Sequence, residues 1–132
     1  MAETKPVDRP LSPHLQIYKP MLTMMMSIVH RATGMALYAG MILLVWWLCA
    51  AAASDDAFAT AQWIFSSWLG LLVLLGFTWA LIHHALGGLR YLYWDTGRGF
   101  ELSRVELMAK ANLAGSIILT ILVWIIAYMV HA

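Results

Sequence analysis

Three long apolar stretches without Asp, Glu, Lys or Arg constrain this chain more than any other feature. The first is uncharged over residues 32–54 and is expected to begin near residue 22; the others cover residues 62–89 and 111–130. Each helical residue adds about 1.5 Å, so roughly 20 apolar residues cross a hydrocarbon core about 30 Å thick. The sequence therefore predicts an all-α membrane protein with three transmembrane helices, over approximately 22–54, 62–89 and 111–130.

The composition excludes several other classes of protein. Hydrophobic residues make up 62% of the chain and charged residues 11%, whereas soluble domains have about 45–50% and about 25%. This excludes an ordinary soluble domain and a disordered tail. The net charge of +1 offers no general attraction to nucleic acid. The single cysteine, Cys49, excludes an intrachain disulfide and a thiolate metal site.

The first 21 residues differ from the rest of the chain. Prolines at positions 6, 10, 13 and 20 rule out a continuous helix there. The segment lacks the apolar centre of a signal peptide and the Arg- and Ser-rich character of a transit peptide. We therefore expect a cytoplasmic arm over residues 1–21 and a membrane anchor domain over residues 22–132. Without a transit peptide, a bacterial inner membrane is favoured over a mitochondrial one.

The charged residues predict the orientation in the membrane. Every basic residue precedes or opens the first span, or lies at the end of the second span or in the following loop: Lys5, Arg9, Lys19, Arg31, Arg90, Arg98, Arg104 and Lys110. The link between the first two spans carries only Asp55 and Asp56. By the positive-inside rule, the N-terminus is cytoplasmic. Three spans then put the C-terminus on the periplasmic side.

Two groups of polar side chains lie inside the predicted spans, and hydropathy does not explain them. They are Ser27, His30 and Arg31 in the first span, and His83, His84 and Arg90 in the second. Because the first span starts where the second ends, both groups fall in the cytoplasmic half. Ionisable residues at membrane depth indicate function. Alternatively, the two arginines extend their head groups toward lipid phosphates.

His84 lies in a column of small residues spaced by four, with Gly76, Ala80 and Gly88. This pattern has two interpretations. A histidine flanked by small residues leaves a shallow groove that suits a flat macrocycle, or the small residues merely let helices approach closely. His83 points about 100° away from His84, so the two cannot bind one metal ion. We expect His83 to be a hydrogen-bonding or lipid-facing neighbour.

Two segments resemble signatures of the cytochrome b subunit of succinate dehydrogenase. The first comprises Arg9-Pro10-Leu11, Leu15, Ser27, His30-Arg31 and Thr33. The second comprises His84, Gly88-Leu89-Arg90-Tyr91-Leu92, Trp94-Asp95 and Gly97. Tyr91 departs from the His or Phe that is usual in the family. Three spans and the total length also match, so the resemblance covers essentially the whole chain.

The resemblance implies an anchor subunit that binds b-type haem together with a second small anchor subunit. His84 would be one axial ligand of the haem iron, and the partner chain would supply the other. His30 and Arg31 would lie near the haem propionates. Ser27 and Arg31 would line a ubiquinone site, where a hydroxyl and a guanidinium can bond the quinone's carbonyl oxygens.

The resemblance also implies the remaining partners and the reaction. A flavoprotein subunit and an iron–sulfur subunit would dock on the cytoplasmic face of this chain, which is surrounded by membrane lipid. The complex would oxidise succinate, a step of the tricarboxylic acid cycle, and pass the electrons to ubiquinone. In this chain no residue would act on succinate itself.

The residues leave two alternatives open. In the first, His30 and His84 ligate haem together, so that the chain is a self-contained cytochrome. In the second, the chain is a haem-free scaffold or transport subunit with structural or proton-relaying histidines. Transporters commonly carry internal repeats and broken helices, and neither pattern is found in this sequence.

Overall fold

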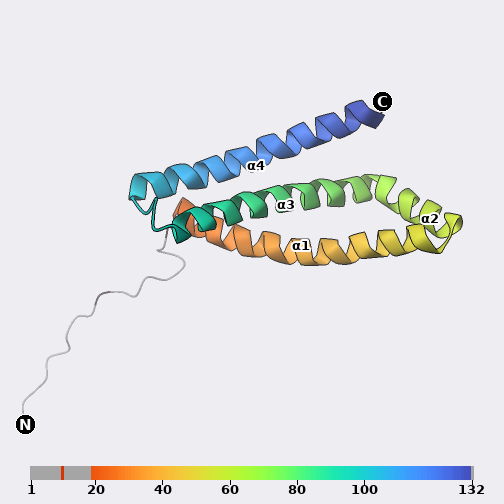
Figure 1. Ribbon diagram of the computed structural model, residues 1–132, viewed down its shortest axis with the longest axis horizontal. Helices are drawn as coiled ribbons and strands as arrows, with labels where there is room; N and C mark the ends of the chain where they lie inside the picture. The colour runs from red at the N-terminus through yellow and green to blue at the C-terminus, as the bar shows by residue number, and fades with distance from the viewer. Residues whose placement is uncertain (1–9, 11–18, 132) are drawn as a thin grey trace, which may run out of the picture.

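The computed structural model describes residue 10 and residues 19–131, and all regular structure in this part of the chain is helical. Four helices follow one another: α1 (Leu22–Ala53), α2 (Asp55–Ser66), α3 (Trp68–Asp95) and α4 (Leu102–His131) (Figure 1). Three of them, α1, α3 and α4, are long and apolar enough to cross a membrane. The predicted all-α fold with three membrane-spanning helices is confirmed.

The helix ends differ from the expected limits of the second and third spans. Residues 62–66 belong to α2, and α3 runs from Trp68 to Asp95 rather than over 62–89. Helix α4 begins at Leu102, well before residue 111. Some of the expected limits lie at charged residues, but a charged residue can interrupt an apolar stretch while the helix continues through it. In α4, for example, Lys110 pairs with Glu106 one turn earlier at 2.8 Å, a spacing that stabilises helices.

Two serines make the sharp corners on either side of α2. The side chain of Ser54 accepts a hydrogen bond from the Ala57 amide at 3.2 Å, and the side chain of Ser67 accepts one from the Gly70 amide at 3.1 Å. Such N-caps satisfy amides that a new helix leaves without partners. Asp55 and Asp56 add favourable negative charge in the first turn of α2.

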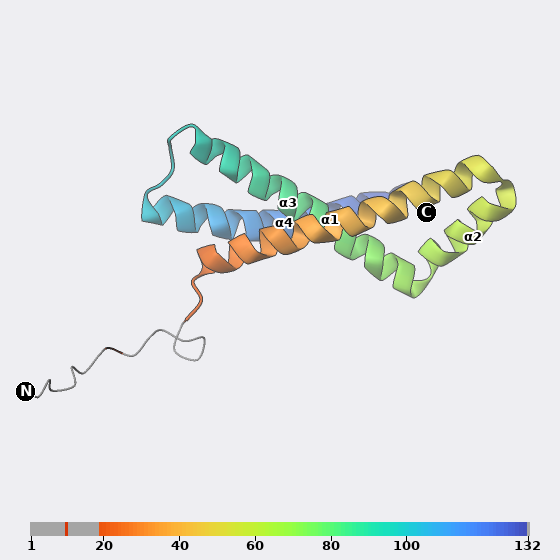
Figure 2. The same cartoon turned by 90° about the horizontal axis from the view of Figure 1, so that it is seen from below.

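Helix α3 packs against both α1 and α4. Figure 1 shows α2 closing one end between α1 and α3, while Figure 2 shows α3 crossing the other two long helices obliquely. The opposite end holds the start of α1, the end of α3 and the start of α4. That end carries Arg98 and Arg104, whereas Asp55 and Asp56 lie at the α2 end. The basic side chains therefore lie at one end, together with Asp95, Glu101 and Glu106, whereas the α2 end carries only the two aspartates among the described residues.

Apart from Met26, the buried side chains among the described residues are small or polar. The buried apolar residues are Met26, Ala50, Ala61, Ala80 and Ala109, and the buried polar ones are Thr33, His83, Arg90, Asn112, Ser116 and Thr120. Large apolar side chains point outward along all three long helices. Helices in lipid gain little by burying leucines and associate through close packing and polar contacts. The polar groups between the helices therefore define where function can lie.

Candidate functional site

Two histidines from different helices stack on each other near the basic end of the molecule. His30 of α1 and His84 of α3 have ring centroids 4.0 Å apart and an interplanar angle of 17°. A glycine on each helix leaves room for the facing ring. A Cβ at Gly87 would lie 2.4 Å from His30 Cδ2, and one at Gly34 would lie 3.2 Å from His84 Cε1. Gly34 and Gly87, which are not among the residues of the two signatures, thus permit a tight α1–α3 contact built around two imidazoles.

Hydrogen bonds from α1 fix the orientation of the His84 ring. Its Nδ1 lies 3.1 Å from the His30 carbonyl oxygen and 3.3 Å from Thr33 Oγ1. The Thr33 hydroxyl donates to the same carbonyl at 2.9 Å. Because a carbonyl only accepts, Nδ1 of His84 must carry the proton, which leaves Nε2 with a free lone pair. Metal-ligating histidines are commonly held in this way.

His83 points to the other side of α3 and contacts two polar side chains of α4. Its side chain is fully buried; Nδ1 lies 3.1 Å from Ser116 Oγ, and the Asn112 amide nitrogen lies 3.4 Å from Nδ1 and 3.3 Å from Nε2. The expectation of a hydrogen-bonding neighbour is confirmed, and the lipid-facing reading is wrong. The polar spacing of four along α4, at Asn112, Ser116 and Thr120, is the sequence signal that could have revealed this contact.

Arg90 lies in an aromatic cluster one turn beyond Gly87. Its side chain is only 6% exposed, and its guanidinium carbon lies 5.0 Å from the Trp94 ring centroid and 5.6 Å from that of Tyr91. Tyr91 in turn meets the His30 ring edge-on, with centroids 5.3 Å apart. The interpretation that Arg90 extends toward lipid phosphates is therefore wrong for the described structure.

Three buried nitrogen atoms around this cluster have no hydrogen-bond partner within residues 19–131: His30 Nε2, Arg90 Nε and Trp94 Nε1. Buried polar atoms normally find partners, and a buried charge without one is costly. These three atoms are therefore unsatisfied in this arrangement, and a group from outside the chain would bond them only where neighbouring side chains move aside.

Ser27 and Arg31 share one face of α1, because they are four residues apart in a continuous helix. Ser27 is half-buried and Arg31 is exposed. Over the described residues, neither side chain has a hydrogen bond or ion pair, so both are available to a ligand. The structure thus brings His30 and His84 into contact but does not join Ser27 or Arg31 to them. Thr33 completes the histidine contact, although sequence reasoning included it only as part of a signature.

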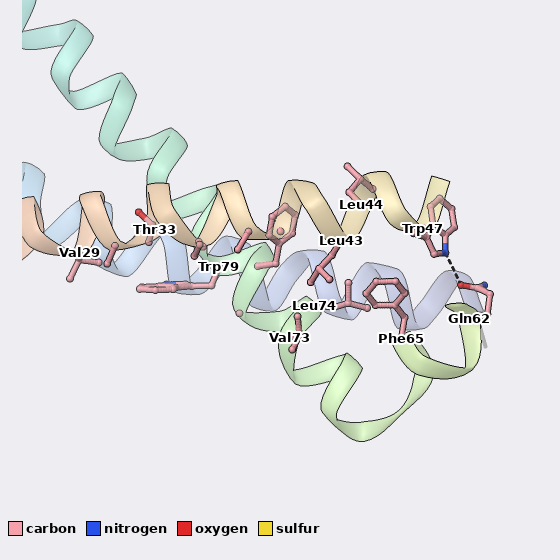
Figure 3. Close-up of a pocket in the computed structure, with 17 residues that line it drawn as sticks. Val29, Thr33, Leu43, Leu44, Trp47, Gln62, Phe65, Val73, Leu74 and Trp79 are labelled. Carbon is pink, nitrogen blue, oxygen red and sulfur yellow. Dashed lines mark hydrogen bonds between the residues drawn. The ribbon is translucent and has the colours of Figure 1, made fainter. Parts of the chain in front are cut away.

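An apolar groove of about 930 Å³ extends from Thr33 to the α2 corner, between α1, α2 and α3. Figure 3 shows its lining, from Val29 and Thr33 at one end to Trp47, which donates to Gln62 at 3.1 Å, at the other. The described residues contain no cluster of three or more His, Cys, Asp or Glu that could hold a metal ion alone. A metal bound at His84 would need further ligands from a cofactor or another chain.

The two interpretations of the small residues can now be separated by position. A Cβ at Gly40 would overlap the Phe77 ring, at 2.1 Å, so this glycine serves close packing of α1 on α3. A Cβ at Gly76 or Gly88 would meet nothing within 4 Å. These two members of the His84 column therefore leave open space rather than a contact within the chain.

Comparisons with known proteins identify the family of this chain. A family model described as the succinate dehydrogenase/fumarate reductase transmembrane subunit matches residues 5–123. The chain is 46% identical to the succinate dehydrogenase cytochrome b556 subunit of Paracoccus denitrificans, covering 98% of this chain and 99% of the relative. It is 35% identical to the corresponding subunit of Rickettsia conorii, covering 89% and 91%.

A mitochondrial relative is also similar. The chain is 35% identical to the succinate dehydrogenase cytochrome b560 subunit of Bos taurus, covering 81% of this chain and 64% of that protein. Family model and relatives together span both signatures and all three long helices. The chain therefore belongs to the family of succinate dehydrogenase/fumarate reductase transmembrane subunits and is a cytochrome b membrane anchor subunit.

Proposed function

We propose that this chain binds b-type haem jointly with a second small anchor subunit and forms part of a ubiquinone reduction site. The observation that carries the proposal is the state of His84. Its Nδ1 is held by the His30 carbonyl and by Thr33, at 3.1 and 3.3 Å. Its Nε2 is therefore free to bind a metal, and the apolar groove begins nearby, at Thr33 and Ala80.

The residues around His84 fit a haem. Open positions at Gly76 and Gly88 on either side of the ring leave space for a flat macrocycle. Bound haem would supply an iron centre that accepts and releases one electron at a time. His84 would supply one nitrogen to the iron, so a second anchor subunit would have to supply the other histidine ligand and the missing wall of the site. Two axial histidines would favour electron transfer over oxygen chemistry.

Cationic and polar side chains near His84 suit the haem propionates. His30 Nε2 is buried without a partner in the described part of the chain. Arg31 is one residue further along α1 and is exposed. Charge-assisted bonds from such groups to carboxylates are strong. We assign His30 and Arg31 to the propionates, with Arg31 also able to reach a quinone.

Ser27 and Arg31 form the proposed ubiquinone contact. A hydroxyl and a guanidinium on one helix face can each donate to a quinone carbonyl oxygen. Arginine stays protonated, so Arg31 would orient the quinone and stabilise negative charge on it rather than deliver a proton. The proton would come from water or from a partner subunit.

The whole complex would include a flavoprotein subunit and an iron–sulfur subunit, which oxidise succinate and pass electrons toward the quinone. We propose that they dock at the basic end. This is where α1 starts, α3 ends and α4 starts, and where Arg98 and Arg104 lie. By the positive-inside rule this end faces the cytoplasm of a bacterium, and the chain lies in its inner membrane.

The test is a dithionite-reduced minus oxidised absorption spectrum of the purified complex, recorded for wild type, His84→Ala and His30→Ala. We expect a low-spin α band that is lost or distorted in His84→Ala and retained in His30→Ala. Loss of the band in His30→Ala alone, with a normal band in His84→Ala, would contradict the assignment. Absence of a band in wild type would favour a haem-free anchor.

The same set of complexes tests the quinone contact. Ser27→Ala and Arg31→Leu should raise the quinone KM or lower quinone turnover, while succinate oxidation by an artificial dye stays unchanged. Unchanged quinone reduction in Arg31→Leu would remove that residue from the site. The stacked rings of His30 and His84 face each other, rather than pointing their nitrogens at a common centre, so the structure offers no support for a self-contained bis-histidine cytochrome.

A further inference from the structure

Two adjacent histidines connect α3 to two different helices at the same level along the α3 axis. His84 is bonded to α1 through the His30 carbonyl, and His83 is bonded to α4 through Asn112 and Ser116. Neighbouring positions on a helix point about 100° apart, and Figure 2 shows α3 crossing α1 and α4. A rotation of α3 about its axis would therefore disturb both contacts together.

The directions of the hydrogen bonds around His83 follow from the donors available. Ser116 Oγ donates to the Leu113 carbonyl at 2.8 Å, so toward His83 it can only accept. His83 Nδ1 must then carry the proton that it shares with Ser116 at 3.1 Å. The Asn112 amide nitrogen contacts both ring nitrogens, at 3.4 Å from Nδ1 and 3.3 Å from Nε2, so it lies against the ring rather than along the Nε2 lone pair. Because the His83 side chain is fully buried, its Nε2 is not open to a metal.

These hydrogen bonds are buried between two membrane-spanning helices, α3 and α4. His83 and Ser116 are 0% exposed and Asn112 is 6% exposed. A polar group buried in apolar surroundings without a hydrogen-bond partner is costly, because the bilayer core offers no water to replace the lost partner. The remaining contacts here involve small side chains, such as Ala109, which is fully buried. The polar bonds therefore select one rotation of α3.

We infer that His83 is a positioning residue that, by bonding Asn112 and Ser116 of α4, fixes the rotation of α3 and hence the direction in which His84 presents its Nε2. The inference rests on the proposed function, in which His84 binds the haem iron. It gives α4, which contributes no ligand, a defined part in the site.

The test uses the purified complex with four variants. His83→Leu removes both polar nitrogens at similar volume, whereas His83→Gln keeps one donor and one acceptor. Ser116→Ala removes only the acceptor for His83. Thr120→Ala is the matched control, because the Thr120 hydroxyl lies on the same buried side of α4 but bonds the Ser116 carbonyl of its own helix at 2.7 Å.

Two readouts separate positioning from mere folding. The first is the largest g-value of the ferric low-spin haem together with its midpoint potential. The second does not need haem: it is the yield of oxidative cross-linking between Leu86→Cys and Gly115→Cys, in a Cys49→Ser background. A Cβ at Gly115 would lie 3.5 Å from Leu86 Cδ1, so this pair reports how α3 faces α4.

His83→Leu is expected to shift the g-value and the potential and to lose most of the cross-link. His83→Gln should restore both, and Thr120→Ala should change neither. Unchanged g-value and cross-link in His83→Leu would overturn the inference. If His83→Leu does not assemble, Ser116→Ala decides in the same way, with a smaller expected shift. A wild-type complex without low-spin haem would refute the proposed function, while the cross-link would still test the rotation of α3.

Discussion

At the scale of single residues, two adjacent histidines with similar Nδ1 contacts have different surroundings. Both rings donate from Nδ1, His84 to the His30 carbonyl and His83 to the Ser116 hydroxyl. The difference lies in exposure: the His83 ring is fully buried against Asn112 and Ser116, whereas the His84 side chain is only half-buried. The sequence could tell that the two rings point in different directions, but only the bonds show which nitrogen stays free.

Thr33 is expected to support the His84 ligand through its hydroxyl. Thr33→Val keeps the shape but removes the oxygen 3.3 Å from His84 Nδ1. Loss of a partner behind a metal ligand typically weakens metal binding by about 10–100-fold. Because the His30 carbonyl remains, we expect about tenfold weaker haem retention, at the low end of that range. Haem per complex, from a pyridine haemochrome assay under increasing detergent washing, measures this change.

Thr33→Ser and Thr60→Val are the controls for that measurement. Thr33→Ser keeps the hydroxyl and should retain haem. Thr60→Val removes a hydroxyl that bonds the Asp56 carbonyl of α2, at 2.9 Å, far from the histidines. Equal losses in Thr33→Ser and Thr33→Val would trace the effect to packing rather than to the hydrogen bond.

At the scale of helices, the α2–α3 corner depends on a glycine. A Cβ at Gly70 would lie 2.3 Å from the Ile64 carbonyl oxygen and 2.7 Å from Phe65 Cα, which are backbone atoms and cannot rotate away. Gly70→Ala should therefore shift the corner and destabilise the protein by about 1–3 kcal/mol. A lower Tm of the purified complex in detergent would show this.

Gly115→Ala is the matched control for the corner. It is also a glycine inside a helix, but its Cβ would make ordinary van der Waals contact with Leu86 at 3.5 Å. Since alanine favours helix more than glycine does, by about 1 kcal/mol, Gly115→Ala should hold or raise the Tm. A Tm that falls equally in both variants would mean that the corner is no more constrained than a helix interior.

The helices themselves could be predicted from sequence, but their ends and mutual contacts could not. Apolar length predicts α1, α3 and α4, while the break at Ser67 is made by a side-chain cap that hydropathy does not register. His30 and His84 could be chosen as site residues from their depth and from the signatures. Their stacking depends on Gly34 and Gly87, and a single sequence does not show which side of a helix meets which neighbour.

At the scale of the whole molecule, this chain buries little apolar surface of its own. Large side chains such as Tyr38, Leu48 and Ile118 are more than half exposed. Lipid can cover such a surface, but a groove of about 930 Å³ lined by α1, α2 and α3 is a concave face. It lies beside His84 and is open where Gly76 lies. We expect the second anchor subunit and the haem to fill it together.

That expectation predicts the effect of blocking the groove. Ala36 lines it and is exposed, so Ala36→Trp fits this chain without a clash in its own core while occupying the space for a partner. Ala36→Trp should lower haem content and the amount of second anchor subunit that copurifies, whereas membrane insertion of this chain persists. The α band measures haem content. Quantitative immunoblots measure membrane insertion of this chain in membranes and the amount of second anchor subunit in the purified complex.

Ile118→Trp is the control for the blocked groove. Ile118 is 56% exposed on α4 and does not line the groove, so a tryptophan there should meet lipid and leave haem and partner unchanged. Equal losses in both variants would indicate that any added bulk disturbs assembly. Full haem and partner in Ala36→Trp would mean that the groove is covered by lipid alone, and the second subunit would then have to bind on another face.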